Sequence, residues 1–415
     1  LMGIAKRSFF AMTSLVFLFT KRTGLLLFGL SSLNGFGQNR VAEMPSLPTG
    51  YSTANASKKR DKDAGGLDVT LGLTTLYDSN ITRASGDGSD DLGSEWLITP
   101  SLRASYDLGN NIWKLGARAG LERDLYQSRD GFDSTNYTFN LFGGYQSKKI
   151  DASFISGISS TSGFNRLNSG FSERFSYNSR LLASYRFTRK TSLLASWNQR
   201  TSESQTEGFG DTSSVTTGLS ALWRASPLLS VGPGFRYGIR TGANEAEFTV
   251  IGPTLRLDYQ LSTKVQFRSS IGLDYADSPF TGEDTLVNWS ASLNYRASAL
   301  WGFDLKMIRD TQASLAAGGG FDEISSYRLS YWRQIRKARA ELGVSYEDRN
   351  PTDSQPTVAG IREFNYLTLS AALTFPIYKD QADLTLNVSW RDQATSDSRT
   401  SWDGLATGLG VQWRF

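Results

Sequence analysis

The sequence predicts an all-β protein, a single transmembrane antiparallel up-and-down β-barrel of about 18 strands. Apolar residues occupy every second position in run after run from Leu67 to the C-terminus, which is the period of a strand with one apolar face. The connections between these runs alternate between short and long. The last run, "GLATGLGVQWRF", has the same alternation and ends on an aromatic residue. We expect it to pair with the first strand, which would leave no free edge.

The N-terminal part of the chain is expected to lie outside this barrel. Residues 1–37 are predicted to be a secretory signal peptide, because basic residues precede an apolar run and small residues precede a cut before Gln38. An N-terminal membrane anchor is the alternative. Residues 38–66 are polar with Pro and Gly, which is typical of a linker or a mobile N-terminal extension.

The barrel itself is expected to span residues 67–415. The run "LDVTLGLTTLY" opens it, and "RFSYNSRLLASYRF" places aromatic and aliphatic residues opposite three arginines. Each run has roughly ten residues, the length that crosses a bilayer when tilted by about 45°. Alternation is weakest at residues 301–335, so the count is expected to be 16 to 18. Later runs start near Ser192, Ser214, Leu229, Phe248, Val265, Thr285, Trp301, Ile324, Ala340, Tyr366, Ala382 and Leu405.

The connections indicate which kind of barrel this is. Turns such as "DLGNN" and "QSKK" are short, whereas loops such as "DRNPTDSQPTVAGIRE" are long and polar. Short periplasmic turns and long outer loops are the rule for bacterial outer-membrane barrels, and an even strand count puts both ends on the periplasmic side. Aromatic residues flank several turns, as Tyr295 and Trp301 do, which predicts interfacial girdles. A soluble sandwich is the alternative.

The composition excludes several kinds of chemistry. The chain has no cysteine and no histidine, so disulfides, thiolate nucleophiles, Ser-His triads and most zinc sites are excluded. No pair of carboxylates stands out as catalytic, so we expect no catalytic residue, no metal site, no cofactor and no enzyme. The acidic loop at residues 85–91 lacks the spacing of a calcium loop. A net charge of +4 without a recognition motif gives no indication of nucleic-acid binding.

The face opposite the apolar residues is expected to line the lumen, and it is rich in arginine. A wall of arginines in a confined channel concentrates anions and selects for them. Asp258 and Asp274 are the acids expected to offset this charge on the same strands. A generic solvated lumen is the alternative, and Arg118, Arg180 and Arg236 are the strongest candidates because they lie mid-strand. The predicted lumen anion-binding residues are Arg118, Arg174, Arg180, Arg200, Arg236, Arg240 and Arg268.

The C-terminal strand resembles the assembly signature of bacterial outer-membrane barrels. Val411, Trp413 and Phe415 fall in step, with the aromatic residue last. The resemblance implies that the barrel assembly machinery recognises these three residues.

The first predicted hairpin resembles the β-barrel porin 2 family. Its first strand ends in Tyr77, Asp78, Asn80 and Ile81, and a long loop leads to a second strand with the core "ITPSL". The resemblance implies an outer-membrane barrel that lets an exopolysaccharide cross the membrane. It also implies contact with lipid and lipopolysaccharide, and with periplasmic polysaccharide-export components as further partners.

Three functions therefore remain open at this point. The first is a channel for an anionic solute or an exopolysaccharide, and the second is a general diffusion porin. The third is a structural or surface-anchoring barrel, plugged by its own loops or by residues 38–66, that conducts nothing.

Overall fold

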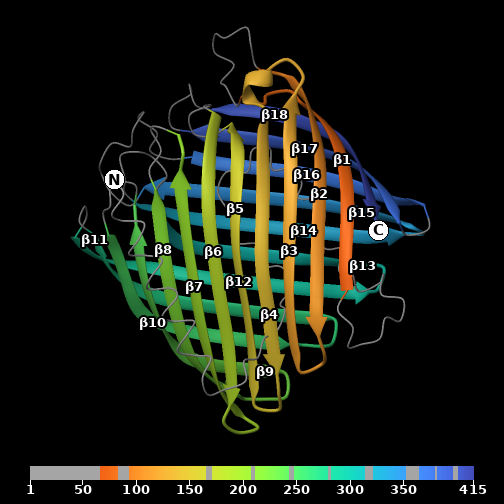
Figure 1. Ribbon diagram of the computed structural model, residues 1–415. Coiled ribbons are helices and arrows are strands. Elements are labelled where there is room, and N and C mark those ends of the chain that lie inside the picture. Colours follow the sequence, from red (N-terminus) through yellow and green to blue (C-terminus); the bar gives the residue numbers. More distant parts are fainter. Residues whose placement is uncertain are drawn as a thin grey trace, which may run out of the picture.

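The computed structural model describes residues 66–82, 93–164, 171–206, 211–242, 247–278, 282–313, 321–351, 364–378, 381–395 and 401–415 (Figure 1). The predicted signal peptide, residues 38–65 of the predicted extension and the acidic loop at residues 85–91 lie outside these described residues. A 3-10 turn, η2 (Asp130–Phe132), follows the third strand. No helix in the described part of the chain is long and apolar enough to cross a membrane.

Within the described residues, eighteen antiparallel strands form one closed sheet, which confirms the predicted fold class. Each strand pairs with its neighbours in sequence, and the last pairs with the first. The strands are β1 (Gly66–Asp78), β2 (Glu95–Gly109), β3 (Trp113–Tyr126), β4 (Ser134–Gln146), β5 (Ile150–Phe164), β6 (Phe171–Arg186), β7 (Thr191–Ser204), β8 (Thr212–Arg224), β9 (Leu229–Thr241), β10 (Glu247–Gln260), β11 (Val265–Ser278), β12 (Gly282–Ser298), β13 (Trp301–Ala313), β14 (Phe321–Ile335), β15 (Ala338–Pro351), β16 (Phe364–Tyr378), β17 (Ala382–Thr395) and β18 (Trp402–Arg414).

The strands are longer than the roughly ten residues expected from the alternation. β1 has 13 residues, β6 has 16 and β12 has 17. The extra residues continue the hydrogen-bonded ladder toward the long loops, beyond the part with an apolar outer face. Backbone pairing does not depend on side-chain polarity, so alternation of apolar residues underestimates the length of a strand.

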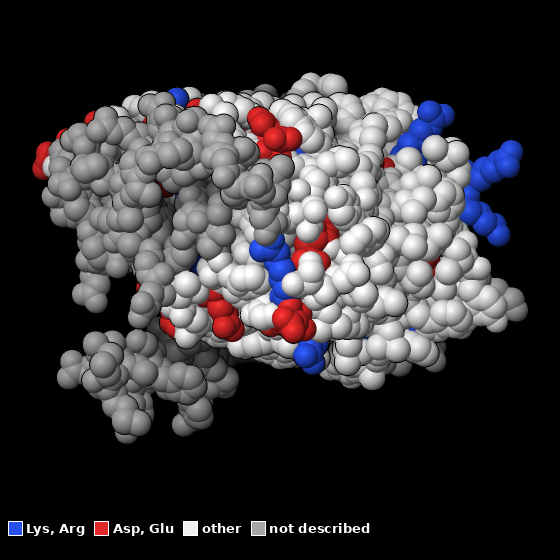
Figure 2. All heavy atoms as spheres, turned by 90° about the horizontal axis from the view of Figure 1, so that it is seen from above, with Lys and Arg blue, Asp and Glu red and all other residues white. Residues whose placement is uncertain are grey.

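The outer surface is apolar along the middle of the barrel. Leu71, Leu102, Leu255 and Leu342 are outward-facing side chains that are 44% to 54% exposed. The flank seen in Figure 2 is correspondingly uncharged over most of its area. A large exposed apolar belt is unfavourable in water, whereas it is satisfied by lipid acyl chains.

Aromatic side chains gather at both ends of this belt. Near the short turns, the ring centroids of Tyr295 and Trp301 lie 5.4 Å apart, and Tyr378 stacks on Trp413 at 5.5 Å. Near the long loops, Tyr77 lies 5.3 Å from Trp96, and other rings pair in the same way. Rings with an apolar body and a polar edge suit the interface between hydrocarbon and water, as the predicted girdles require.

The barrel closes where β1 meets β18. The register runs from Thr70 opposite Arg414 to Asp78 opposite Ala406. The Phe415 N–H extends the ladder by donating to the carbonyl oxygen of Val69 at 2.9 Å. The C-terminal strand is therefore paired on both sides and leaves no open edge.

A buried ion pair stabilises the junction of β1 and β18 near the long loops. Arg391 Nη2 on β17 lies 2.5 Å from Asp78 Oδ2 on β1, and both side chains are 1% exposed. Asp78 also accepts a hydrogen bond from the Asn80 N–H at 3.1 Å, and the Asn80 amide donates to the Asp403 carbonyl at 3.0 Å. Ile81 packs into an apolar cluster. The Tyr-Asp-x-Asn-Ile element thus turns the chain and joins three strands.

We predict that Asp78→Asn lowers the free energy of unfolding by about 3–5 kcal/mol, because it leaves the Arg391 guanidinium buried beside a neutral amide. The measurement is the urea dependence of the folded, heat-modifiable band in detergent. Arg103→Gln is the control, since the Arg103–Glu122 pair at 2.6 Å is 45% and 36% exposed and such pairs contribute roughly 0–1 kcal/mol. Equal losses in the two variants would contradict the prediction.

Candidate functional site in the barrel interior

Four neighbouring strands present arginine to the interior without any acid. On β6 to β9, the side chains directly opposite one another across the ladders share a face, so the register assigns each residue to the inside or the outside. Leu181 and Phe235 are on the exposed outer face, and the arginines occupy the alternate positions. No acid is inward-facing on these described strands. The seven inward-facing arginines are Arg174, Arg180, Arg186, Arg200, Arg224, Arg236 and Arg240.

Glycines give these arginines room to extend. Arg236 lies between Gly218 on β8 and Gly252 on β10 in the register. A Cβ at Gly252 would come within 1.8 Å of the Leu273 carbonyl oxygen, so the backbones of β10 and β11 approach each other more closely than any side chain allows. With no side chains beside it, the Arg236 guanidinium reaches into the interior rather than packing along the wall.

The opposite wall lies close to this arginine face. The Cα atoms of β13 come within 8 Å of those of β8 and β9, although β13 is four strands from β9 along the sheet. Figure 1 shows the strands of the two walls crossing over each other. The barrel is therefore flattened here, and long side chains of one wall reach those of the other.

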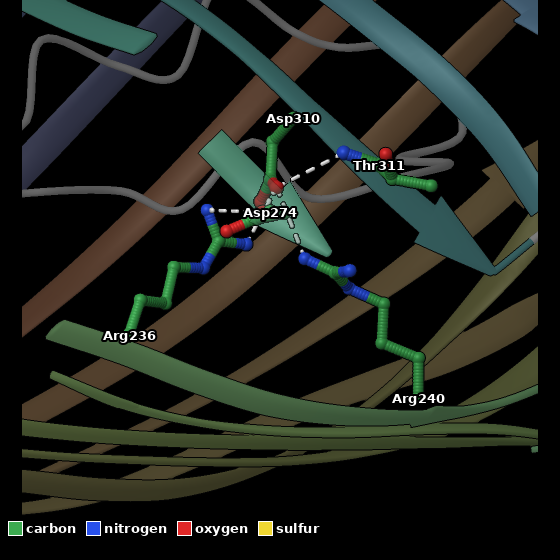
Figure 3. Close-up of polar contacts among 5 residues, drawn as sticks. All are labelled: Arg236, Arg240, Asp274, Asp310 and Thr311. Atoms are coloured by element: carbon green, nitrogen blue, oxygen red, sulfur yellow. Dashed lines mark hydrogen bonds and ion pairs between the residues drawn. The ribbon is translucent and has the colours of Figure 1, made fainter. Parts of the chain in front are cut away.

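Two arginines and two aspartates form an ionic bridge across this narrow part (Figure 3). Arg236 Nη2 on β9 lies 2.6 Å from Asp310 Oδ1 on β13, and Arg240 Nη2 lies 3.0 Å from the same oxygen. Arg236 Nη1 is 3.5 Å from Asp274 Oδ2 on β11, and the Thr311 N–H donates to Asp310. Arg240 is only 3% exposed, and a charge this buried is stable only when it is paired.

A second group of cations lies toward the long-loop end. The Arg174 guanidinium, 5% exposed, donates to Ser202 Oγ at 3.0 Å, while its Nη2 atom has no hydrogen-bond partner within the described residues. Arg174 and Arg200 are close enough to repel each other, and Arg200 also interacts with Arg349 on the opposite wall. Arg349 pairs with Asp322 on β14 at 3.2 Å and with Glu347 on β15 at 3.4 Å, so two acids share this cluster.

Three inner cations also lie over aromatic rings near the long loops. Arg240 lies 5.8 Å above Phe248, Arg349 lies 5.1 Å above Phe364, and Arg391 lies 6.0 Å from the Trp402 ring. Phe248 itself stacks on Phe321 at 4.4 Å. The interior at this end is thus filled in part by ring and guanidinium stacks, which are stabilised by cation–π attraction.

The structure brings together some of the predicted anion-binding residues and separates others. Arg236 joins Arg240, and Arg174 joins Arg200, each pair on one side of the flattened interior. Arg118 lies apart on β3, with its guanidinium 4.5 Å above Phe142. Arg268 faces inward opposite Asp258, near the short turns, and is exposed.

More of the positive charge of the inward-facing arginines is neutralised by acids than the sequence suggests. Asp258 pairs with Arg256 on the same strand, whereas Asp274 on β11 pairs with Arg236 on β9. The acid that binds both Arg236 and Arg240 is Asp310, which sequence reasoning missed. Continuing the alternation along β13 from Asp304 and Lys306 would have placed it on the inner face.

Charge is distributed unevenly along the barrel axis. The described residues of the short turns include no acid, whereas acids are frequent beside the long loops. Figure 2 shows basic side chains projecting from the end of the molecule at which the C-terminus lies in Figure 1. The basic residues of the short turns are Lys148, Lys149, Arg189, Lys190, Lys264, Arg336 and Lys337.

Comparisons with known proteins give only a likeness of fold. No family model and no curated protein matches the chain. Among solved structures, the FrpB iron transporter of Neisseria meningitidis (F3-3 variant) has 11% identity and a TM-score of 0.45, over 84% of this chain and 81% of that one. OprD of Pseudomonas aeruginosa has 10% identity and a TM-score of 0.42, over 85% of this chain and 95% of that one. OpdK of the same organism, solved with vanillate, has 12% identity and a TM-score of 0.42, over 84% of this chain and 98% of that one.

No group of three or more carboxylate, histidine or cysteine side chains in the described part of the chain is arranged to hold a metal ion.

We predict that Asp310→Asn loosens the ionic bridge between the two walls, because Arg236 and Arg240 then repel each other without a shared anion. The free energy of unfolding should fall by about 1–3 kcal/mol, and the conductance of the protein in a planar bilayer should rise. Asp383→Asn is the matched control: it removes the same charge from an inward-facing ion pair, with Arg414, that does not join opposite walls. An equal conductance change in both variants would show that the bridge does not restrict passage.

Proposed function

We propose that the chain is an outer-membrane channel that passes anionic solutes, rather than an enzyme. The observation that carries this proposal is the inner face of β6 to β9, whose described residues include seven arginines and no acid. In a confined interior with low-dielectric walls, such an arc produces a positive potential that concentrates anions and excludes cations.

The outer surface supports placement in the outer membrane. An apolar belt with aromatic residues at both ends matches the thickness and chemistry of a bilayer, and the closed sheet leaves no unpaired edge in lipid. By the rule for bacterial barrels, the long loops face the outside, and the short turns and both ends of the barrel face the periplasm. Lipid and the phosphate groups of lipopolysaccharide are the partners of this surface.

The uneven charge along the axis favours an exported solute. Basic residues surround the short-turn end, which is the periplasmic end in this orientation, and they would attract anions arriving from inside the cell. An acidic exopolysaccharide fits this direction, as does the resemblance of the first hairpin, and periplasmic export components would then deliver it. A general diffusion porin is the alternative, for which no such direction is needed.

One observation favours a second candidate, a barrel that conducts nothing. Near the long loops, the interior holds the buried Asp78–Arg391 pair and an aromatic cluster of Phe364, Tyr366 and Trp402. Interior packing of this kind stabilises a barrel that serves as a structural or anchoring unit.

Reconstitution of the purified protein in planar bilayers separates the two candidates. If the protein is an anion channel, we expect discrete steps of current. Under a KCl gradient, the reversal potential should have the same sign as the equilibrium potential of chloride. A correctly inserted, heat-modifiable barrel that passes no current would support the structural candidate.

We predict that Arg118→Gln combined with Arg180→Gln moves the reversal potential toward zero. Neither arginine is in an ion pair within the described residues, so removing both charges lowers the positive potential without exposing a buried acid. Arg256→Gln is the control, because Arg256 is already neutralised by Asp258 at 3.2 Å. A shift in the control as large as that in the double variant would contradict the assignment of selectivity to the unpaired arginines.

The C-terminal strand is proposed to carry the signal read by the assembly machinery. Val411, Trp413 and Phe415 project outward from β18, and Phe415 is 69% exposed. An aromatic side chain with few contacts in the folded barrel remains available during assembly.

We predict that Phe415→Ala reduces the amount of folded protein in the outer membrane of cells, while refolding of the purified chain in detergent is nearly unchanged. The two yields are measured by the heat-modifiable band. Leu67→Ala is the control, since it removes another highly exposed side chain, 58% exposed, near the start of β1. Loss of refolding in detergent by Phe415→Ala alone would indicate a structural role instead.

A further inference from the structure

Two neighbouring short turns each carry a pair of exposed basic residues at their tips. The turn between β4 and β5 contains Lys148 and Lys149. The turn between β6 and β7 contains Arg189 and Lys190. Because β5 and β6 are adjacent in the sheet, the two turns lie side by side, about 10 Å apart, which is two strand spacings (Figure 1).

A hydroxyl side chain stabilises each of these turns. Ser147 Oγ accepts a hydrogen bond from the Lys149 N–H at 3.3 Å, and Thr188 Oγ1 accepts the equivalent bond from the Lys190 N–H at 3.1 Å. The basic side chains are therefore not needed to hold the turns. Within the described residues, none of these four side chains forms an ion pair or a hydrogen bond.

Two further cations end beside these turns. Arg186 and Arg224 are the last residues of β6 and β8, and both are exposed. Arg186 Nη1 donates to the Lys148 carbonyl oxygen at 3.5 Å, and the Arg224 N–H donates to the Lys190 carbonyl oxygen at 2.7 Å. Six cations thus lie along this rim, which we call the basic turn patch: Lys148, Lys149, Arg186, Arg189, Lys190 and Arg224.

The acids of this part of the barrel lie elsewhere or face inward. Strands β4 to β9 contain three acids, two of which, Glu173 and Glu203, lie at the long-loop ends. Asp151 is the third, and it faces the interior because the preceding residue faces outward. On the flanking strands, Asp107 also faces inward, and Asp258 is already paired on its own strand. The described residues therefore leave an excess of positive charge on the patch.

Apolar side chains extend the outer belt to the level of this patch. Tyr185 and Phe187 both project outward and are exposed, and their ring centroids lie 4.8 Å apart. Arg189 follows Phe187 by two residues, and the exposed Trp223 directly precedes Arg224. The cations are thus within about 10 Å of the aromatic girdle along the chain. The headgroup layer of a bilayer, roughly 5–8 Å thick on each side, occupies this depth.

We propose that the basic turn patch binds the phosphate groups of anionic glycerophospholipids in the leaflet on the short-turn side. The proposal rests on the membrane placement proposed above and not on the conduction of a solute. Cations beside a membrane-spanning segment are typical of sites for anionic headgroups. Arginine donates paired N–H bonds to phosphate oxygens, and lysine supplies a point charge. The adjacent girdle holds these groups at the depth of a lipid phosphate, below the level at which a soluble partner would contact them.

The first test is the lipid that the purified protein retains in detergent. The protein is incubated with equimolar phosphatidylglycerol and phosphatidylcholine of identical acyl chains, and the bound lipids are counted by native mass spectrometry. We expect phosphatidylglycerol to be retained about fivefold over phosphatidylcholine, the preference given by one cation beside an anionic headgroup. Incubation in 1 M ammonium acetate should remove the preference, because the Debye length is then about 3 Å. Equal retention of both lipids at low salt would overturn the site.

Variants assign the preference to the patch. Lys148→Gln with Lys149→Gln, and Arg189→Gln with Lys190→Gln, should each lower the ratio of the two lipids. The fourfold variant should bring that ratio to within about twofold of one, since the main electrostatic attraction is then lost. A fourfold variant that keeps the native ratio would overturn the site.

The matched control is Lys114→Gln with Arg123→Gln, which removes the same charge as either double variant. Lys114 faces the interior on β3, and Arg123 lies on the outer face of the same strand near the long loops. This control should keep the native ratio of lipids. A loss as large as that of a double variant would show that net charge, rather than the patch, sets the preference.

Thermal unfolding in bilayer discs separates loss of binding from failure to fold. In discs of phosphatidylcholine alone, the fourfold variant should unfold at the native midpoint, because Ser147 and Thr188 still hold the turns. Adding phosphatidylglycerol should raise the midpoint of the native protein and not that of the fourfold variant. An equal rise in both proteins would contradict the proposal.

A soluble acidic polymer is the competing occupant of the patch. Sodium polygalacturonate, an acidic polysaccharide, is therefore added to the protein in discs of phosphatidylcholine, where no anionic lipid competes. Binding of the polymer that depends on the four turn cations, without a preference for phosphatidylglycerol, would overturn the lipid assignment.

Planar bilayers distinguish failure of this site from failure of the channel. A preference for phosphatidylglycerol in a barrel that passes no current would support the site and remove the channel. An anion-selective current without that preference would leave the channel and remove the site. Failure of the folded protein to insert into either lipid would overturn the membrane placement on which the site rests.

Discussion

Every feature of this barrel depends on the hydrogen bonds between β1 and β18. A sheet that meets lipid must pair all its backbone groups, because an unpaired N–H or C=O in hydrocarbon is costly. The pairing of Leu71 with Trp413 and of Leu73 with Val411 satisfies the first and last strands together. Closure in turn fixes which side chains face inward on every other strand, since one register propagates around the ring.

Flattening of the barrel determines which inner side chains contact each other across the interior. In a round barrel of this size, arginines on one wall would meet water, and each would be solvated separately. Here β13 approaches β8 and β9, so Arg236 and Arg240 share Asp310. The same geometry thus produces a neutralised ionic bridge between the two walls.

The sequence was sufficient to predict the strands and their faces, because alternation is a local property. Leu229, Val265, Trp301 and Ala382 begin strands at the positions where the alternation begins. Contacts across the interior were not predictable in this way. They depend on the shape of the closed ring, which brings Asp310 to Arg236 over 74 residues of sequence, and no periodic pattern encodes that shape. The seam pair of Asp78 and Arg391 was missed for the same reason.

The balance of charge in the interior separates structural from functional cations. Arg391, Arg349 and Arg240 are buried, and each has a carboxylate partner and an aromatic ring, so their charge is used to hold strands together. By contrast, no ion pair of Arg118 or Arg180 is found within the described residues, so their charge adds to the positive potential of the interior.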